Sequence, residues 1–216
     1  MSIRFFIYLL LLLAVFTYGM LNFKRLSIPF KILTFFLGLT FLSETISRIA
    51  ILLYRNSAPV DHIFAVTEYI MVAMIYYRLS TDKTFKRFLL FSIPVFIILA
   101  IFSMLLYQGI LEFPSVLLSI QEVAFVIFSL LYFKEMLLNP ISISLKKQSA
   151  FWFNTAFFLF SSVIFLCFGL MNSFIKSKLG TTFLDTFVYT LNIIFYCTIG
   201  LSLIIESKKT INVSYH

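Results

Sequence analysis

Seven long runs of apolar residues follow one another along the chain, and the short stretches between them hold most of its charges. Each run has the roughly 20 residues that a helix needs to cross the hydrocarbon core of a bilayer. The breaks contain charged residues, Asn, Pro or Gly, which are typical of loops. The pattern predicts seven transmembrane helices, at about 5–22, 28–54, 60–79, 88–107, 115–136, 150–174 and 182–205.

The first run is similar to a secretory signal peptide in one respect, because a basic residue, Arg4, precedes its apolar stretch. It is longer than the apolar region of such peptides, no small-residue cleavage site follows it, and Lys24 and Arg25 close it. We therefore expect it to remain as the first span. The 216 residues then predict an all-α, polytopic membrane protein, with residues 1–216 forming a single domain and a single bundle of seven transmembrane helices.

Composition supports this fold class and excludes several others. Hydrophobic residues make up 61% of the chain and charged residues 12%, against about half and about a quarter in soluble domains. The chain is therefore not expected to be soluble, disordered or a nucleic-acid binder, although its net charge is +8.

The distribution of that charge predicts how the chain is oriented. Alternate breaks place 12 of the 17 Lys and Arg residues on the side that also holds the C-terminus, so this side carries +9 and the opposite side −1. The positive-inside rule then places the N-terminus outside and the C-terminus in the cytoplasm. On the inner face, Lys83, Lys86 and Arg87 are interpreted as topology signals and contacts to anionic lipids. The high Ile, Phe, Lys and Asn content indicates an AT-rich prokaryote, so we expect a bacterial cytoplasmic (inner) membrane.

Polar residues inside the spans are the candidates for function, because a charge near the centre of a membrane helix costs at least about 2.5–3.5 kcal/mol. Most of them fall in the outer half of the membrane or near its midplane. Together they predict a pocket that opens to the outside and is lined by Glu44, Arg48, His62, Glu68, Tyr69, Gln121, Glu122, Asp185, Tyr189 and Asn192. The same residues are also compatible with a purely structural network that locks the helices together.

Known chemistries that need a defined residue set are not predicted. His62 is the only histidine inside a span, which excludes the three-histidine zinc site of seven-helix hydrolases. The last span has no lysine for a retinal Schiff base, and no GxSxG element is present. We expect no metal, no other cofactor and no catalytic residue, although a cation site made only of Glu44, Glu68 and Glu122 stays open.

Three functions remain, in decreasing order of support. The first is a module that binds or senses a small polar or cationic ligand, with Arg48 holding a carboxylate or phosphate and the glutamates holding an amine. Signalling would then need a separate partner protein. The second is a transporter of a small solute, coupled to protons that Glu68 or Glu122 takes up. The third is an intramembrane enzyme that uses two of the carboxylates as acid and base.

Overall fold

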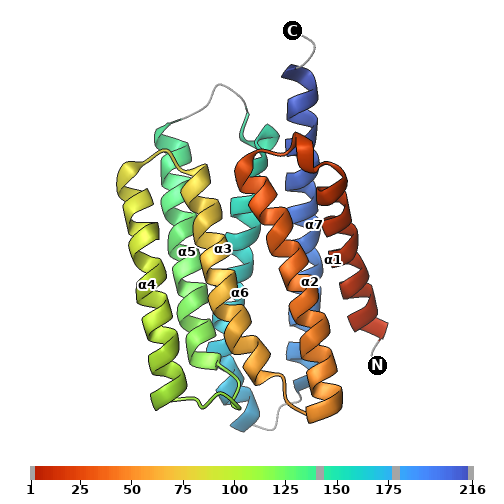
Figure 1. Cartoon of the computed structure of the whole chain (residues 1–216), viewed down its shortest axis with the longest axis vertical. Coiled ribbons are helices and arrows are strands. Elements are labelled where there is room, and N and C mark those ends of the chain that lie inside the picture. The colour runs from red at the N-terminus through yellow and green to blue at the C-terminus, as the bar shows by residue number, and fades with distance from the viewer. Residues whose placement is uncertain (1–2, 140–143, 177–180, 214–216) are drawn as a thin grey trace. The chain divides into compact units, whose positions relative to one another are not determined.

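The computed structural model describes residues 3–139, 144–176 and 181–213, and it describes their side chains except at 168–185 and 210–213. Within this part the chain forms seven α-helices and two short 3-10 helices (Figure 1). All seven α-helices contain an apolar stretch long enough to cross a membrane, which confirms the predicted spans. The helices are α1 (Ile3–Leu21), α2 (Ile28–Tyr54), α3 (Ala58–Leu79), α4 (Lys83–Leu106), α5 (Ser115–Leu138), α6 (Ser149–Lys176) and α7 (Thr181–Val213), and the 3-10 helices are η1 (Phe23–Arg25) and η2 (Leu145–Lys147).

Local sequence explains several helix ends. Asp82 caps α4, because its Oδ1 accepts hydrogen bonds from the backbone N–H groups of Thr84 and Phe85 at 2.7 and 3.4 Å. Pro59 lies in the first turn of α3, where its missing N–H group costs nothing. After α2, Arg55 adopts the left-handed conformation with φ 56°, which ends that helix and turns the chain.

Contacts within the chain group the residues into two compact units. The central unit is Ile28–Gln121, which comprises α2, α3, α4 and the start of α5. In this unit α3 packs against both α2 and α4, and successive helices run in opposite directions (Figure 1). Leu37 of α2, Val72 and Tyr76 of α3, and Leu89 of α4 are fully buried.

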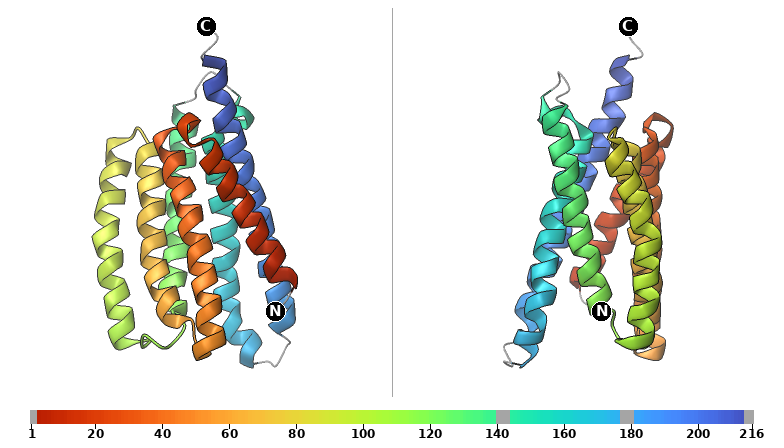
Figure 2. Two further views of the ribbon diagram at one scale, coloured as in Figure 1. Left: turned by 45° about the vertical axis from the view of Figure 1, so that its right-hand side comes forward. Right: turned by 90° about the vertical axis from the view of Figure 1, so that its left-hand side faces the viewer.

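The terminal unit joins Met1–Ser27 to Glu122–His216. In it α7 packs against α6 and α1, and α1 runs in the same direction as α7 (Figure 2). Two side-chain hydrogen bonds tie α1 to α7, from Arg4 Nη1 to Thr186 Oγ1 and between the Tyr18 and Ser207 hydroxyl groups, each at 2.8 Å. The start of α1 and the end of α7 therefore lie at opposite ends of this unit.

Large apolar side chains are exposed on every one of the seven helices. Leu10, Leu53, Leu106 and Leu166, for example, are 71, 69, 68 and 59% exposed. Soluble proteins rarely expose continuous apolar surface on this scale. The helices are suited to hydrocarbon as their solvent, and we conclude that the chain is an integral, multi-pass membrane protein.

Candidate functional site

The link between α2 and α3 is built around Asp61, near the start of α3. Both carboxylate oxygens of Asp61 accept a hydrogen bond from a hydroxyl group, Oδ1 from Ser47 at 3.1 Å and Oδ2 from Ser57 at 2.9 Å. Ser47 belongs to α2 and Ser57 precedes α3. Asp61 therefore closes the α2–α3 hairpin and acts as a structural residue.

At the same end of the central unit, the loop between α4 and α5 is tied to the α2–α3 hairpin. Asn56 Nδ2 donates to the carbonyl oxygen of Leu111 at 2.9 Å, and His62 Nε2 lies 3.1 Å from the carbonyl oxygen of Glu112. Because a carbonyl only accepts, His62 Nε2 carries the hydrogen and donates it. His62, predicted to line the pocket, thus has a structural partner.

Deeper along α3, one hydrogen bond joins two of the predicted site residues. Gln121 Nε2, from α5, donates to Glu68 Oε2, from α3, at 2.7 Å. The Gln121 side chain is fully buried, whereas that of Glu68 is partly exposed. The other amide atom, Gln121 Oε1, is buried and has no hydrogen-bond partner among the described residues. The amide therefore places an unused acceptor next to the Glu68 carboxylate.

Two charged residues of α2 complete this group. The charge of Glu44 acts on the Glu68 carboxyl group, so the two acidic side chains lie near each other. Arg48 follows Glu44 by four residues and so lies on the same face of α2. Both α2 side chains are partly exposed. We call Glu44, Arg48, Glu68 and Gln121 the polar cluster, which has two carboxyl groups and one guanidinium group.

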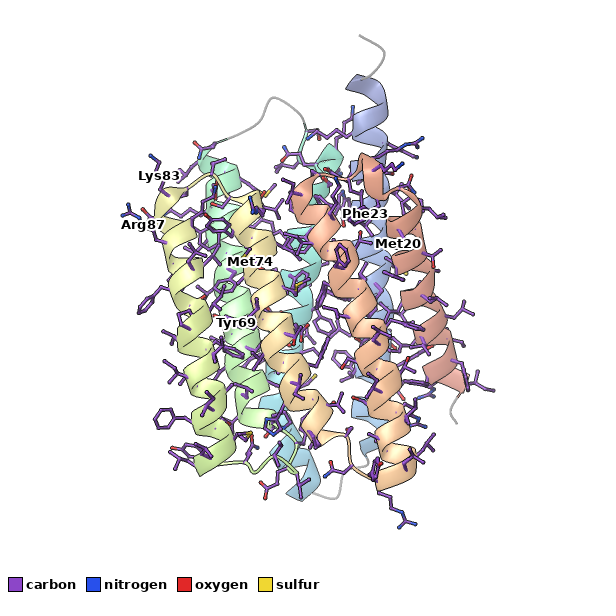
Figure 3. The ribbon with its side chains drawn as sticks, in the orientation of Figure 1. Met20, Phe23, Tyr69, Met74, Lys83 and Arg87 are labelled. Carbon is purple, nitrogen blue, oxygen red and sulfur yellow. The ribbon has the colours of Figure 1, made fainter. Side chains whose placement is uncertain are left out.

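Tyr69 lies outside this cluster and faces α4 (Figure 3). Its ring stacks on Phe96, with 3.9 Å between ring centroids and 1° between planes, and its hydroxyl group hydrogen-bonds Ser92. Successive residues of a helix point about 100° apart, so Tyr69 and Glu68 cannot share a face. Tyr69 packs α3 against α4.

A groove of about 320 Å³ also lies between α3 and α4. Its walls are almost entirely apolar and include Val66, Ile97 and Met104, with His62 at one side. No carboxylate lines it, and its polar side chains, His62 and Thr67, already hydrogen-bond the backbone carbonyl oxygens of Glu112 and Ile63, so this groove does not extend the polar cluster.

The remaining predicted site residues belong to the terminal unit. Glu122 is buried and Tyr189 is partly exposed. Asn192 Nδ2 donates to the carbonyl oxygen of Val188 in its own helix at 3.0 Å. The side chain of Asp185 lies outside the described residues.

Sequence reasoning missed a second set of buried polar contacts in the terminal unit. Glu206 of α7 is only 7% exposed, and its Oε2 accepts a hydrogen bond from Ser149 Oγ at the first residue of α6. Asn154, also fully buried, donates from Nδ2 to the backbone carbonyl of Ser129 in α5 at 3.1 Å. The signal for Glu206 was the absence of Gly and Pro after residue 205, which lets α7 continue past the apolar run.

The described residues form no site that could hold a metal ion. No three His, Cys, Asp or Glu side chains there come close enough to hold a metal ion. This includes the three glutamates considered above as a carboxylate-only cation site. Cys167 and Cys197 are free thiols.

Comparison of the chain with protein-family models, curated proteins and solved structures finds no match. The assignment of function therefore rests on the geometry of the polar cluster.

Proposed function

We propose that this integral membrane protein binds a small cation carrying N–H groups, and that the polar cluster of α2, α3 and α5 is its binding site. The observation that carries the proposal is the Gln121 amide. Its Nε2 donates a hydrogen bond to Glu68 Oε2 at 2.7 Å. Its Oε1 is buried and has no hydrogen-bond partner among the described residues.

A buried acceptor without a donor costs about 1–3 kcal/mol. An N–H group of a bound ligand removes that cost, and the Glu68 carboxylate next to it favours a positive charge on the same ligand. A primary ammonium group supplies both the charge and the hydrogens, whereas a quaternary ammonium supplies only the charge.

Charge balance favours a cation for a second reason. A bound cation favours the state in which Glu44, Glu68 and Arg48 are all ionised, and in that state the three side chains sum to −1. An uncompensated charge within the membrane is costly, and such residues usually face a partner or a cavity. A single monovalent cation neutralises the cluster.

Access from the outside follows from the proposed orientation. Seven crossings leave the two termini on opposite sides, and the excess of Lys and Arg near the C-terminal side supports a cytoplasmic C-terminus. Glu44, Glu68 and Gln121 then lie in the outer half of a bacterial inner membrane. The ligand would come from the extracytoplasmic side.

The test compares two probes of equal charge on the purified protein in detergent, at constant ionic strength. Ethylammonium should raise the melting temperature in a saturable manner, and tetramethylammonium should not. Glu68→Gln and Gln121→Met should each weaken ethylammonium binding by roughly tenfold or more, because a hydrogen bond to a charged group contributes about 1.5–3 kcal/mol.

Glu112→Gln is the matched control, since it also removes one carboxylate but on the exposed α4–α5 loop. It should bind ethylammonium as the wild type does. Equal responses to the two probes, or undiminished binding by a folded Glu68→Gln variant, would contradict the proposal. Because Gln121→Met keeps side-chain size and charge, it separates loss of binding from loss of folding.

A further inference from the structure

The turn between α3 and α4 concentrates positive charge at one end of the central unit. Within residues 78–87 the chain has four basic side chains, Arg78, Lys83, Lys86 and Arg87, and one acidic side chain, Asp82. The segment therefore carries a net charge of +3. We call the four basic residues the basic patch.

An aromatic ring brings two of these cations together from different helices. The Arg78 guanidinium carbon lies 5.9 Å from the centre of the Tyr77 ring, and Lys86 Nζ lies 5.4 Å from the same centre. Both distances are within the range of a cation–π interaction. Tyr77 thus gathers charge from α3 and α4 at one place.

The acidic residue of this turn is already engaged by the backbone. Asp82 Oδ1 accepts hydrogen bonds from two N–H groups in the first turn of α4. Lys83 and Arg87, four residues apart in the same helix, are exposed and project to the same side (Figure 3). Two positively charged groups are therefore available to a ligand at the start of α4.

The surface next to these cations is apolar. Phe91 and Val95 continue the stripe of Lys83 and Arg87 along α4 at spacings of four residues, and they are 70 and 38% exposed. Ile98, three residues further, is 53% exposed. A pair of cations at the end of a span, followed by an exposed apolar stripe within the span, matches a phospholipid, whose anionic phosphate is attached to hydrocarbon chains.

We propose that the basic patch binds the headgroup of an anionic phospholipid, whose acyl chain lies along Phe91 and Val95 of α4. Since α3 ends at Leu79 and α4 begins at Lys83, the patch lies where the spans leave the hydrocarbon. A soluble phosphorylated partner would use the cations but not the apolar stripe.

The experiment uses the full-length protein and native mass spectrometry with added phosphatidylglycerol or phosphatidylcholine. The wild type should retain phosphatidylglycerol in preference to phosphatidylcholine. The triple variant Lys83→Gln/Lys86→Gln/Arg87→Gln should weaken phosphatidylglycerol binding by roughly a hundredfold, from the usual contribution of each basic residue near a membrane surface.

A matched control removes the same number of charges elsewhere. Lys134, Lys146 and Lys147 are all exposed and belong to the terminal unit. The variant Lys134→Gln/Lys146→Gln/Lys147→Gln should keep most of the phosphatidylglycerol binding. Equal loss in the two triple variants would show that the lipid responds to overall charge and would overturn the site.

The apolar part of the proposal has its own test. Phe91→Ser removes the side chain against which the acyl chain packs and leaves every charge in place. It should weaken binding of phosphatidylglycerol but not of inorganic phosphate. If the patch instead binds phosphate as tightly as the lipid, a soluble anion is the ligand and the lipid proposal fails.

Discussion

Two asparagines show how the same side chain serves different purposes in this protein. Asn154 is fully buried and donates to the carbonyl oxygen of Ser129 on another helix. Asn192 donates to Val188 within its own helix. The first contact holds α6 to α5, whereas the second satisfies the side-chain amide within α7 itself.

This difference predicts unequal effects of the same substitution. Asn154→Leu should lower the free energy of unfolding by about 1 kcal/mol, which is typical of a hydrogen bond between membrane helices. Asn192→Leu should change it by less than about 0.5 kcal/mol. Unfolding in mixed micelles by increasing SDS measures both values, and equal losses would contradict the assigned roles.

For single residues, the sequence predicts how deep a side chain lies in the membrane, but it does not predict how each helix is rotated about its own axis. Glu68 and Gln121 were both predicted to lie in the outer half of the membrane or near its midplane, and the structure joins them by a hydrogen bond. Their pairing could not be predicted, because it depends on how α3 and α5 turn about their axes. For the same reason, the sequence did not show that Tyr69 packs on Phe96.

At the scale of elements, helix positions were predictable because each span is long and nearly free of charge. The largest differences occur where polar residues continue a helix. The structure starts α4 at Lys83 instead of about 88, because Asp82 caps it there, and extends α7 to Val213 instead of about 205. Hydropathy marks where a helix enters hydrocarbon, whereas caps and helix breakers determine where it ends.

Gly200 of α7 faces Val15 of α1 where these two helices pack together. A Cβ atom added to Gly200 would lie 3.4 Å from Val15 Cγ2, which is ordinary van der Waals contact. Gly200→Ala should therefore change the free energy of unfolding by less than about 0.5 kcal/mol. Gly200→Leu should lower it by about 1–3 kcal/mol through overpacking.

Val15→Ala provides the control for this contact. It removes the methyl groups that a larger residue at 200 would meet. The double variant Val15→Ala/Gly200→Leu should therefore lose less free energy of unfolding than the two single variants lose in sum. Strict additivity of the two free-energy changes would show that α1 and α7 do not meet at this point.

At the scale of the whole molecule, the composition was enough to predict a membrane protein with several spans, but it was not enough to predict which polar residues come together. The apolar content predicted a polytopic membrane protein, and seven suitable helices are present in the described part. The predicted pocket drew on residues from several helices at once. Six of its ten residues lie in the central unit, and four of these, Glu44, Arg48, Glu68 and Gln121, make up the polar cluster. Such a grouping depends on tertiary contacts, which hydropathy does not encode.

The proposed binding site requires that the chain cross the membrane with the polar cluster in its outer half. Single cysteines at Thr81 in the α3–α4 turn and at Glu112 in the α4–α5 loop test it, in a Cys167→Ala/Cys197→Ala background. In intact cells, a membrane-impermeant maleimide should label Glu112→Cys, and it should label Thr81→Cys only after permeabilisation. The reverse pattern would place the cluster in the cytoplasmic half, and labelling of both positions in intact cells would show that α4 does not span the membrane.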